Sequence, residues 1–164
     1  MPAVSNTSPL FNLAAIHQLS LLRHAFDQIL IPDAVLHELE PVREYSGVRA
    51  IHEAMAQGWI VVQAPRDVSR IQSLEQDLGR GEAAAIALAL EIRLRRILID
   101  ERDGSRMAEQ CGLEPVGVLG VLLGAKRQGQ LESVKELLIA LRDEVGFYIR
   151  PNLFQKVLHL AGED

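Results

Sequence analysis

The chain has 164 residues, enough for one globular domain over residues 1–164, and its 48% hydrophobic and 24% charged residues exclude a disordered, collagenous or low-complexity protein. Cys111 is the only cysteine, which excludes an intramolecular disulfide or a zinc site built from cysteines and favours the reducing cytoplasm. The net charge of −5 argues against a protein that binds nucleic acid over its whole surface, so any such contact must be local.

Short apolar runs alternate with helical patterns along the chain, which is typical of βαβ units with a parallel sheet. The predicted strands cover residues 3–5, 29–31, 59–62, 97–99 and 115–116. Four predicted helices are defined by their starts, at Pro9 with Ser8 as the cap, and at Ser20, Pro32 and Pro151. The other predicted helices cover residues 48–58, 70–78, 82–94, 105–110, 118–128 and 134–145. The alanine-rich segment 82–94 is apolar on nearly all sides, which indicates a buried helix, and 97–99 indicates a buried central strand. These patterns predict an α/β fold.

Membrane and export segments are not expected. Residues 115–125, the longest uncharged apolar run near the C-terminal half, fall well short of the ~20 residues that a membrane helix needs. The first ten residues have no basic leader. We expect a cytoplasmic protein with no membrane partner.

Certain acidic and amide residues occupy related places in these elements. Asp100 ends the best strand, Glu82 opens the most buried helix, Glu38 follows the 29–31 strand, and Asn6 leaves the first strand. In a parallel sheet all four approach the edge where ligands bind. Several carboxylates in one cleft stay ionised only beside a cation, and Mg²⁺ or Mn²⁺ prefers such oxygen ligands. The pattern predicts a metal-dependent phosphodiesterase, in which the metal polarises the phosphate and lowers the pKa of a bound water.

Each acid also has a structural explanation. Glu82 is a suitable acid for a helix start, and Glu38 suits the polar face of an amphipathic helix. Asp100 or Asp103 could cap the next helix. Glu101 is expected to face solvent. The joint pattern therefore carries more weight than any one residue.

Four segments occur in an order and spacing that resemble a known family. They are VSNTSPLFNLAAI from Val4, IPDAVLHELE from Ile31, GRGEAAAIALAL from Gly79 and ILIDERDGSRMAEQCGL from Ile97. The chain resembles the PIN-domain superfamily, and within it a prokaryotic branch related to VapC-type toxin nucleases. The segment VGVLGVLLGAKRQGQL from Val116 extends the likeness over most of the chain.

The resemblance implies a three-layer α/β/α sandwich with a central, mainly parallel sheet of four or five strands. It implies an endoribonuclease that cleaves single-stranded RNA with Mg²⁺ or Mn²⁺, often a toxin neutralised by an antitoxin protein, and a homodimer. Carried over by position, the metal ligands fall on Asn6, Glu38, Glu82, Asp100 and Asp103, of which the four acids are also the expected catalytic residues. Thr7 or Ser8 would be the small polar residue beside the metal, where we expect contact with the substrate.

Asn6 departs from the wider superfamily, which has Asp at this position. An amide oxygen can bind a hard cation, but it is neutral, weaker and unable to act as a base. The alternative is therefore a catalytically weak or inactive PIN-like module that binds RNA or a protein partner. A further alternative, a phospho-acceptor receiver-like domain centred on Asp100, lacks an acid pair at the end of the first strand.

Arginine supplies most of the 17 basic residues, and its planar fork suits phosphate groups. Arg80, Arg102 and Arg106 flank the acidic segments and are candidates for contacts with the RNA backbone. The alternative is that they pair with neighbouring acids. With 4 Phe, 1 Trp and 2 Tyr, the chain has little material for stacking bases.

Overall fold

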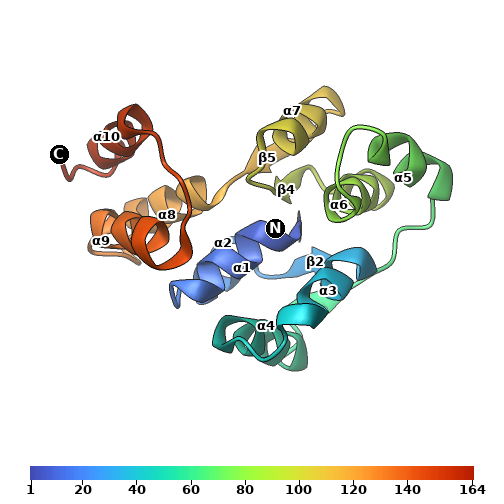
Figure 1. Cartoon of the computed structure of the whole chain (residues 1–164), viewed down its shortest axis with the longest axis horizontal. Coiled ribbons are helices and arrows are strands. Elements are labelled where there is room, and N and C mark those ends of the chain that lie inside the picture. Colours follow the sequence, from blue (N-terminus) through green and yellow to red (C-terminus); the bar gives the residue numbers. More distant parts are fainter.

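The computed structural model describes residues 1–164, and its strands form one sheet with helices on both faces (Figure 1). The strands are β1 (Ala3–Ser5), β2 (Ile29–Ile31), β3 (Ile60–Val62), β4 (Arg96–Leu98) and β5 (Glu114–Val116). Their order across the sheet is β3-β2-β1-β4-β5, and every neighbouring pair is parallel. The three-layer α/β/α architecture with five parallel strands confirms the predicted fold class.

Helices connect the strands and continue beyond the last one. They are α1 (Thr7–Ala15), α2 (Ser20–Phe26), α3 (Asp33–Leu39), α4 (Ser46–Ala56), α5 (Val68–Glu75), α6 (Arg80–Glu91), α7 (Arg102–Gln110), α8 (Val118–Arg127), α9 (Val134–Ala140) and α10 (Pro151–Leu160). A short 3₁₀ helix, η1 (Glu40–Val42), follows α3, and a π-helical turn, η2 (Leu141–Val145), extends α9. None of the helices is long and apolar enough to cross a membrane.

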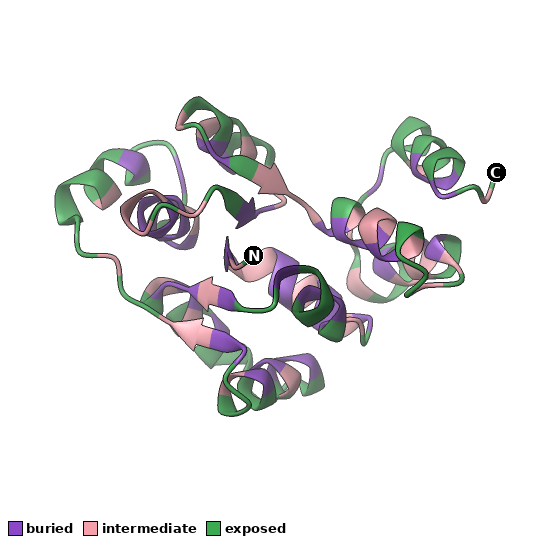
Figure 2. Ribbon diagram, turned by 180° about the vertical axis from the view of Figure 1, so that it is seen from behind, coloured by how far each residue is buried: buried purple, intermediate pink, exposed green.

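The two faces of the sheet have separate apolar cores, because side chains alternate along each strand. Ala3, Ile29 and Leu98 pack into the larger core with α1, α2, α4 and α8 to α10. Val4 and Ile97 pack into the smaller core with α5, α6 and α7. Figure 2 shows α6 buried along most of its length, as its alanine-rich sequence predicts. Small side chains let this helix lie close to the sheet.

The connections diverge between β1 and β4. From the central strand β1 the chain passes to β2 and then β3, crosses back through α5 and α6 to β4, and continues to β5 on the other side. In open parallel sheets, ligands bind outside the carboxyl ends of the strands at such a divergence. The residues that follow β1 and β4 therefore border the expected crevice.

Several helix starts differ from the sequence prediction by one to three residues, and two of these differences concern candidate site residues. Helix α1 begins at Thr7, so Asn6 and not Ser8 holds the N-cap position; its N–H donates to the Leu98 carbonyl (2.9 Å) and so prolongs β1. Helix α7 begins at Arg102, which places Asp103 in the first turn and Glu101 at the N-cap position. Asp103 is therefore not a cap.

Candidate active site

Asn6 directly follows β1, beside the point where the connections diverge, and is only 3% exposed. Its side-chain amide nitrogen Nδ2 donates to Glu101 Oε2 (3.2 Å). Its amide oxygen Oδ1 is buried and has no hydrogen-bond partner. Since a buried acceptor without a partner is costly, this oxygen is a candidate ligand atom.

Two hydroxyl groups of the first turn of α1 hold carboxylates beside Asn6. Thr7 Oγ1 donates to Glu38 Oε2 (2.6 Å), and Ser8 Oγ donates to Glu101 Oε1 (2.6 Å). These bonds link α1 to α3 and to the segment after β4. Thr7 and Ser8 thus position two acids, and their contact with the substrate stays a prediction from the sequence.

Glu82 brings a third carboxylate from the start of α6. Its Oε1 accepts a hydrogen bond from the Gly79 N–H (3.3 Å), and its Oε2 is buried without a partner. The pKa of Glu82 is raised, first by burial, then by the negative charge of Glu101, and further by Asp103 and Glu38, against the opposing Gly79 N–H. Glu82 is therefore both the helix-start acid of the structural explanation and a member of an acidic cluster.

Two glycines keep the space beside these oxygens free. A Cβ added to Gly81 of α6 would collide with Glu38 Oε1 and lie 2.9 Å from Asn6 Oδ1. A Cβ added to Gly104 of α7 would collide with Glu82 Oε2. The absence of a side chain at Gly81 leaves room for the oxygens of Asn6 and Glu38, and its absence at Gly104 leaves room for the Glu82 carboxylate.

This set of residues fits a hard divalent cation. We call Asn6, Glu38, Glu82, Glu101 and Asp103 the acidic cluster. All its potential ligand atoms are oxygens, two of them buried without a partner, and none of its carboxylates takes part in an ion pair. The side chains make hydrogen bonds to one another and to α1, and no group of three or more acids, histidines or cysteines already has a metal-binding arrangement.

Asp100 faces a different part of the molecule. Its Oδ1 accepts a hydrogen bond from the Val118 N–H (2.9 Å), while its Oδ2 is buried without a partner. Burial raises the pKa of Asp100 to about 6, the charge of Glu101 adds to this rise, and the Val118 N–H opposes it. Asp100 therefore caps α8 and not the next helix, and its charge is not among those that raise the pKa of Glu82.

The prediction that Glu101 faces solvent was wrong. Glu101 is half-buried and accepts hydrogen bonds from Asn6 and Ser8. Ile97 and Ile99 pack into the core beneath α6, whereas Leu98 packs into the opposite core. Continuing this alternation puts Glu101 on the α6 side and Asp100 on the α8 side. Counting the alternation from Ile97 would have predicted Glu101.

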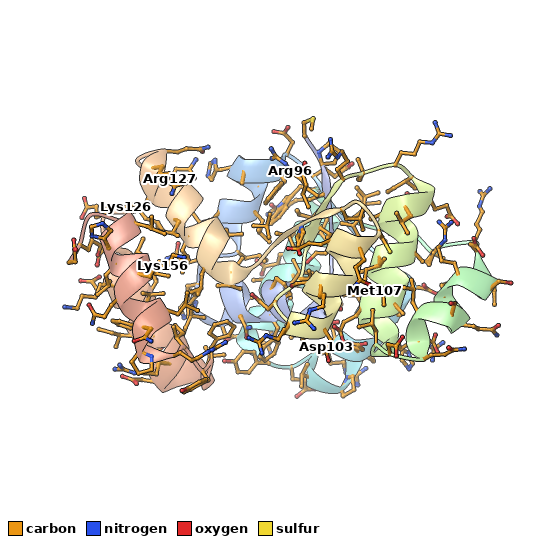
Figure 3. The ribbon with its side chains drawn as sticks, turned by 90° about the horizontal axis from the view of Figure 1, so that it is seen from above. Arg96, Asp103, Met107, Lys126, Arg127 and Lys156 are labelled. Atoms are coloured by element: carbon orange, nitrogen blue, oxygen red, sulfur yellow. The ribbon has the colours of Figure 1, made fainter.

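The three arginines proposed for phosphate contacts remain exposed. Arg80, Arg102 and Arg106 form no ion pair, so the alternative that they pair with neighbouring acids does not hold. Arg106 borders, with Asp103, a hollow of about 300 Å³. Figure 3 shows Lys126, Arg127 and Lys156 at one end of the molecule, apart from Asp103 on α7.

Comparison with known proteins places these features in a family. A family model described as a PIN domain matches residues 2–163. No curated protein and no solved structure shows a significant match. PIN domains have nuclease-type functions and generally depend on divalent metals, which removes the receiver-like alternative. The match spans nearly the whole length and agrees with the motifs and the parallel fold, so the chain belongs to the PIN-domain family.

Proposed function

We propose that the protein is a metal-dependent endoribonuclease that cleaves single-stranded RNA with Mg²⁺ or Mn²⁺ at the acidic cluster. The observation that carries this proposal is the set of acids without a basic partner beside the buried amide of Asn6. Glu101 contacts this amide, and Glu38 lies near its oxygen at Gly81. Glu101, Asp103 and Glu38 in turn act electrostatically on Glu82. Four like charges at one place repel one another unless protons or a cation compensate them. A divalent cation would also attract the phosphodiester that this acidic protein otherwise repels.

The members of the acidic cluster would hold the cation through their oxygens. Bound there, a divalent cation supplies Lewis-acid polarisation of the phosphate and a water of lowered pKa. Thr7 and Ser8 fix the orientation of Glu38 and Glu101 by the short hydrogen bonds described above. Glu82, with its raised pKa, can hold a proton when no cation compensates its neighbours. Asn6 contributes a neutral oxygen and accepts no proton.

Asp100 was the expected ligand at the end of β4, but the geometry favours Glu101 in that role. Glu101 contacts Asn6 directly and acts electrostatically on Glu82. The Asp100 carboxylate instead accepts a hydrogen bond from the Val118 N–H at the start of α8, where a helix N-terminus favours a negative charge. The two adjacent acids are thus expected to differ in function.

Cleavage of a labelled single-stranded RNA by the purified protein tests the proposal. We expect cleavage with Mn²⁺ or Mg²⁺ and none in EDTA. Glu101→Gln should lower the rate at least about a hundredfold, since it removes one charged ligand. Asp100→Asn should keep cation-dependent cleavage, and Glu109→Gln, an exposed acid on α7, is the matched control. Cleavage that survives both EDTA and Glu101→Gln would overturn the assignment.

A catalytically weak or inactive module is the second candidate, and Asn6 is the observation that favours it. The neutral amide gives the cluster one negative charge fewer than an aspartate would. If the natural protein binds RNA without cleaving it, and Asn6→Asp creates cation-dependent cleavage, the module is the correct assignment. Equal cleavage by both proteins supports the active enzyme.

We further propose the role of a toxin in a toxin–antitoxin pair, with an antitoxin protein and a second copy of the chain as partners. The support is the likeness of the motifs to the VapC-related branch. Expression should arrest growth, and Glu101→Gln should relieve the arrest. Coexpression of the product of an adjacent upstream reading frame should restore growth, and light scattering should give the mass of a dimer. Unimpaired growth or a monomer would count against the corresponding role.

A further inference from the structure

A second hollow opens beside the acidic cluster, on the other side of the segment that follows β4. It has a volume of about 390 Å³ and is bordered by Ile99 and Asp100, by Ser105 of α7, and by the start of α8. Its outer wall comes from the connection between η2 and α10, through Phe147, Tyr148 and Arg150, and from Leu153. We call it the Tyr148 pocket. Asp100 lines it, and the next residue, Glu101, belongs to the acidic cluster, so the two sites are neighbours.

The outer wall is held in place by the fold. Gly146 has a left-handed backbone (φ 77°) that ends η2, and the Phe147 N–H donates to the Leu141 carbonyl (2.9 Å). Ile149 is buried in the larger core. Tyr148 and Arg150 flank this buried residue, and both border the pocket. The connection thus anchors Ile149 and presents its two neighbours at the pocket.

Neither Tyr148 nor Arg150 is explained by packing or pairing within the chain. Tyr148 is 79% exposed, and its hydroxyl makes no hydrogen bond to the protein. Arg150 is exposed and forms no ion pair, although Asp100 borders the same pocket. Exposed aromatic rings and free guanidinium groups are the groups that bind bases and phosphates of single strands.

The composition of the pocket suits one nucleotide. Phe147, Tyr148 and Leu153 offer apolar and aromatic surface for a base, and Arg150 offers a positive charge for a phosphate. Asp100 and Ser105 supply polar atoms at the inner side. The sequence has few aromatic residues, and two consecutive ones, Phe147 and Tyr148, border this hollow.

We propose that the Tyr148 pocket binds a nucleotide of the single-stranded RNA next to the phosphodiester held at the acidic cluster, with Tyr148 stacking on the base and Arg150 contacting a backbone phosphate. The inference rests on the proposed function, because it takes the acidic cluster as the place of cleavage. It assigns Tyr148 and Arg150 to substrate binding and leaves the cation to the acidic cluster.

Binding and cleavage of one labelled single-stranded RNA, measured separately, test the proposal. Binding is measured by fluorescence anisotropy at low salt in EDTA, where no cleavage is expected. Tyr148→Ala should weaken binding about tenfold and Tyr148→Phe, which keeps the ring, by less than about twofold. Arg150→Ala should also weaken binding and lower the slope of log affinity against log salt by about one. Arg23→Ala, an exposed arginine on α2, is the matched control and should bind as the natural protein does.

Cleavage with Mn²⁺ separates failure of this inference from failure of the proposed function. If Glu101→Gln abolishes cleavage while Tyr148→Ala and Arg150→Ala bind and cleave normally, the pocket assignment is overturned and the nuclease stands. If binding depends on Tyr148 and Arg150 but cation-dependent cleavage is absent, the pocket assignment stands and the nuclease falls. Absence of RNA binding both in EDTA and with Mn²⁺, or a protein partner that covers Tyr148 without affecting RNA binding, overturns the pocket assignment.

Discussion

The raised pKa of Asp100 gives a quantitative prediction for stability. Its pKa is about 6 in the folded protein and has an ordinary value of 3.8, so between these pH values the folded state binds a proton that the unfolded state has lost. The contribution of Asp100 to the free energy of unfolding therefore falls as pH rises through this interval. At about 1.4 kcal/mol for each pKa unit, the whole interval corresponds to about 3 kcal/mol.

Asp100→Asn removes this titration while keeping an oxygen that can accept from the Val118 N–H. Any constant cost of the new amide group applies at every pH, so the change with pH is the informative quantity. Relative to the natural protein, the variant should gain about 2 to 3 kcal/mol between pH 4 and pH 8. Urea unfolding in EDTA, followed by the fluorescence of the buried Trp59, measures it. Glu109→Gln is the control. If the free energy of unfolding of Asp100→Asn changes with pH in parallel with that of the natural protein, the reasoning is refuted.

Three further predictions concern the acidic cluster. Gly81→Ala should weaken cation binding in calorimetry, because the new methyl group displaces the Glu38 carboxylate and crowds Asn6 Oδ1. Gly124→Ala, which meets nothing within 4 Å, should leave cation binding unchanged and stabilise its helix by about 0.5 to 1 kcal/mol, and equal cation binding by the two variants would contradict the proposed site. Mn²⁺ at a hundred times its Kd should stabilise the natural protein by about 2.7 kcal/mol in thermal unfolding, and an equal gain in Glu101→Gln would place the cation elsewhere. Asn6→Asp loses the hydrogen bond to Glu101 and should lower the free energy of unfolding in EDTA by about 1 to 3 kcal/mol. At saturating Mn²⁺ the variant should become more stable than the natural protein, and a variant that stays less stable with Mn²⁺ would exclude residue 6 as a ligand.

The fold was largely accessible from the sequence because its strands are short apolar runs separated by strong helix signals. The runs 3–5 and 29–31 were predicted with the bounds that β1 and β2 have. Helix starts were less accurate, because the cap of α1 depends on a backbone hydrogen bond from Asn6 to the neighbouring strand. Such a bond between segments more than ninety residues apart leaves no local signal in the sequence.

The acids that gather in the structure were mostly visible in the sequence, but the face of the sheet to which each side chain belongs emerges only when the alternation along β4 is counted. Asp100 stood out because it ends a buried run, and Glu101 looked like part of a solvated turn. The alternation along β4 reverses this order of importance, since one residue along an extended chain changes the face of the sheet. The Tyr148 pocket gave no signal, because it joins the end of β4 to a connection more than forty residues later.

The two neighbouring acids explain how one short segment can serve two sites. Glu101 makes its contacts with Asn6 and Ser8, on the side of the acidic cluster. Asp100 fixes the start of α8 and lines the Tyr148 pocket on the other side. An RNA strand bound across this segment would meet a cation on one side and a base-binding hollow on the other. On the proposed function the negative charge of the chain is no obstacle to binding RNA, because the acids that repel a phosphate would also hold the cation that attracts it.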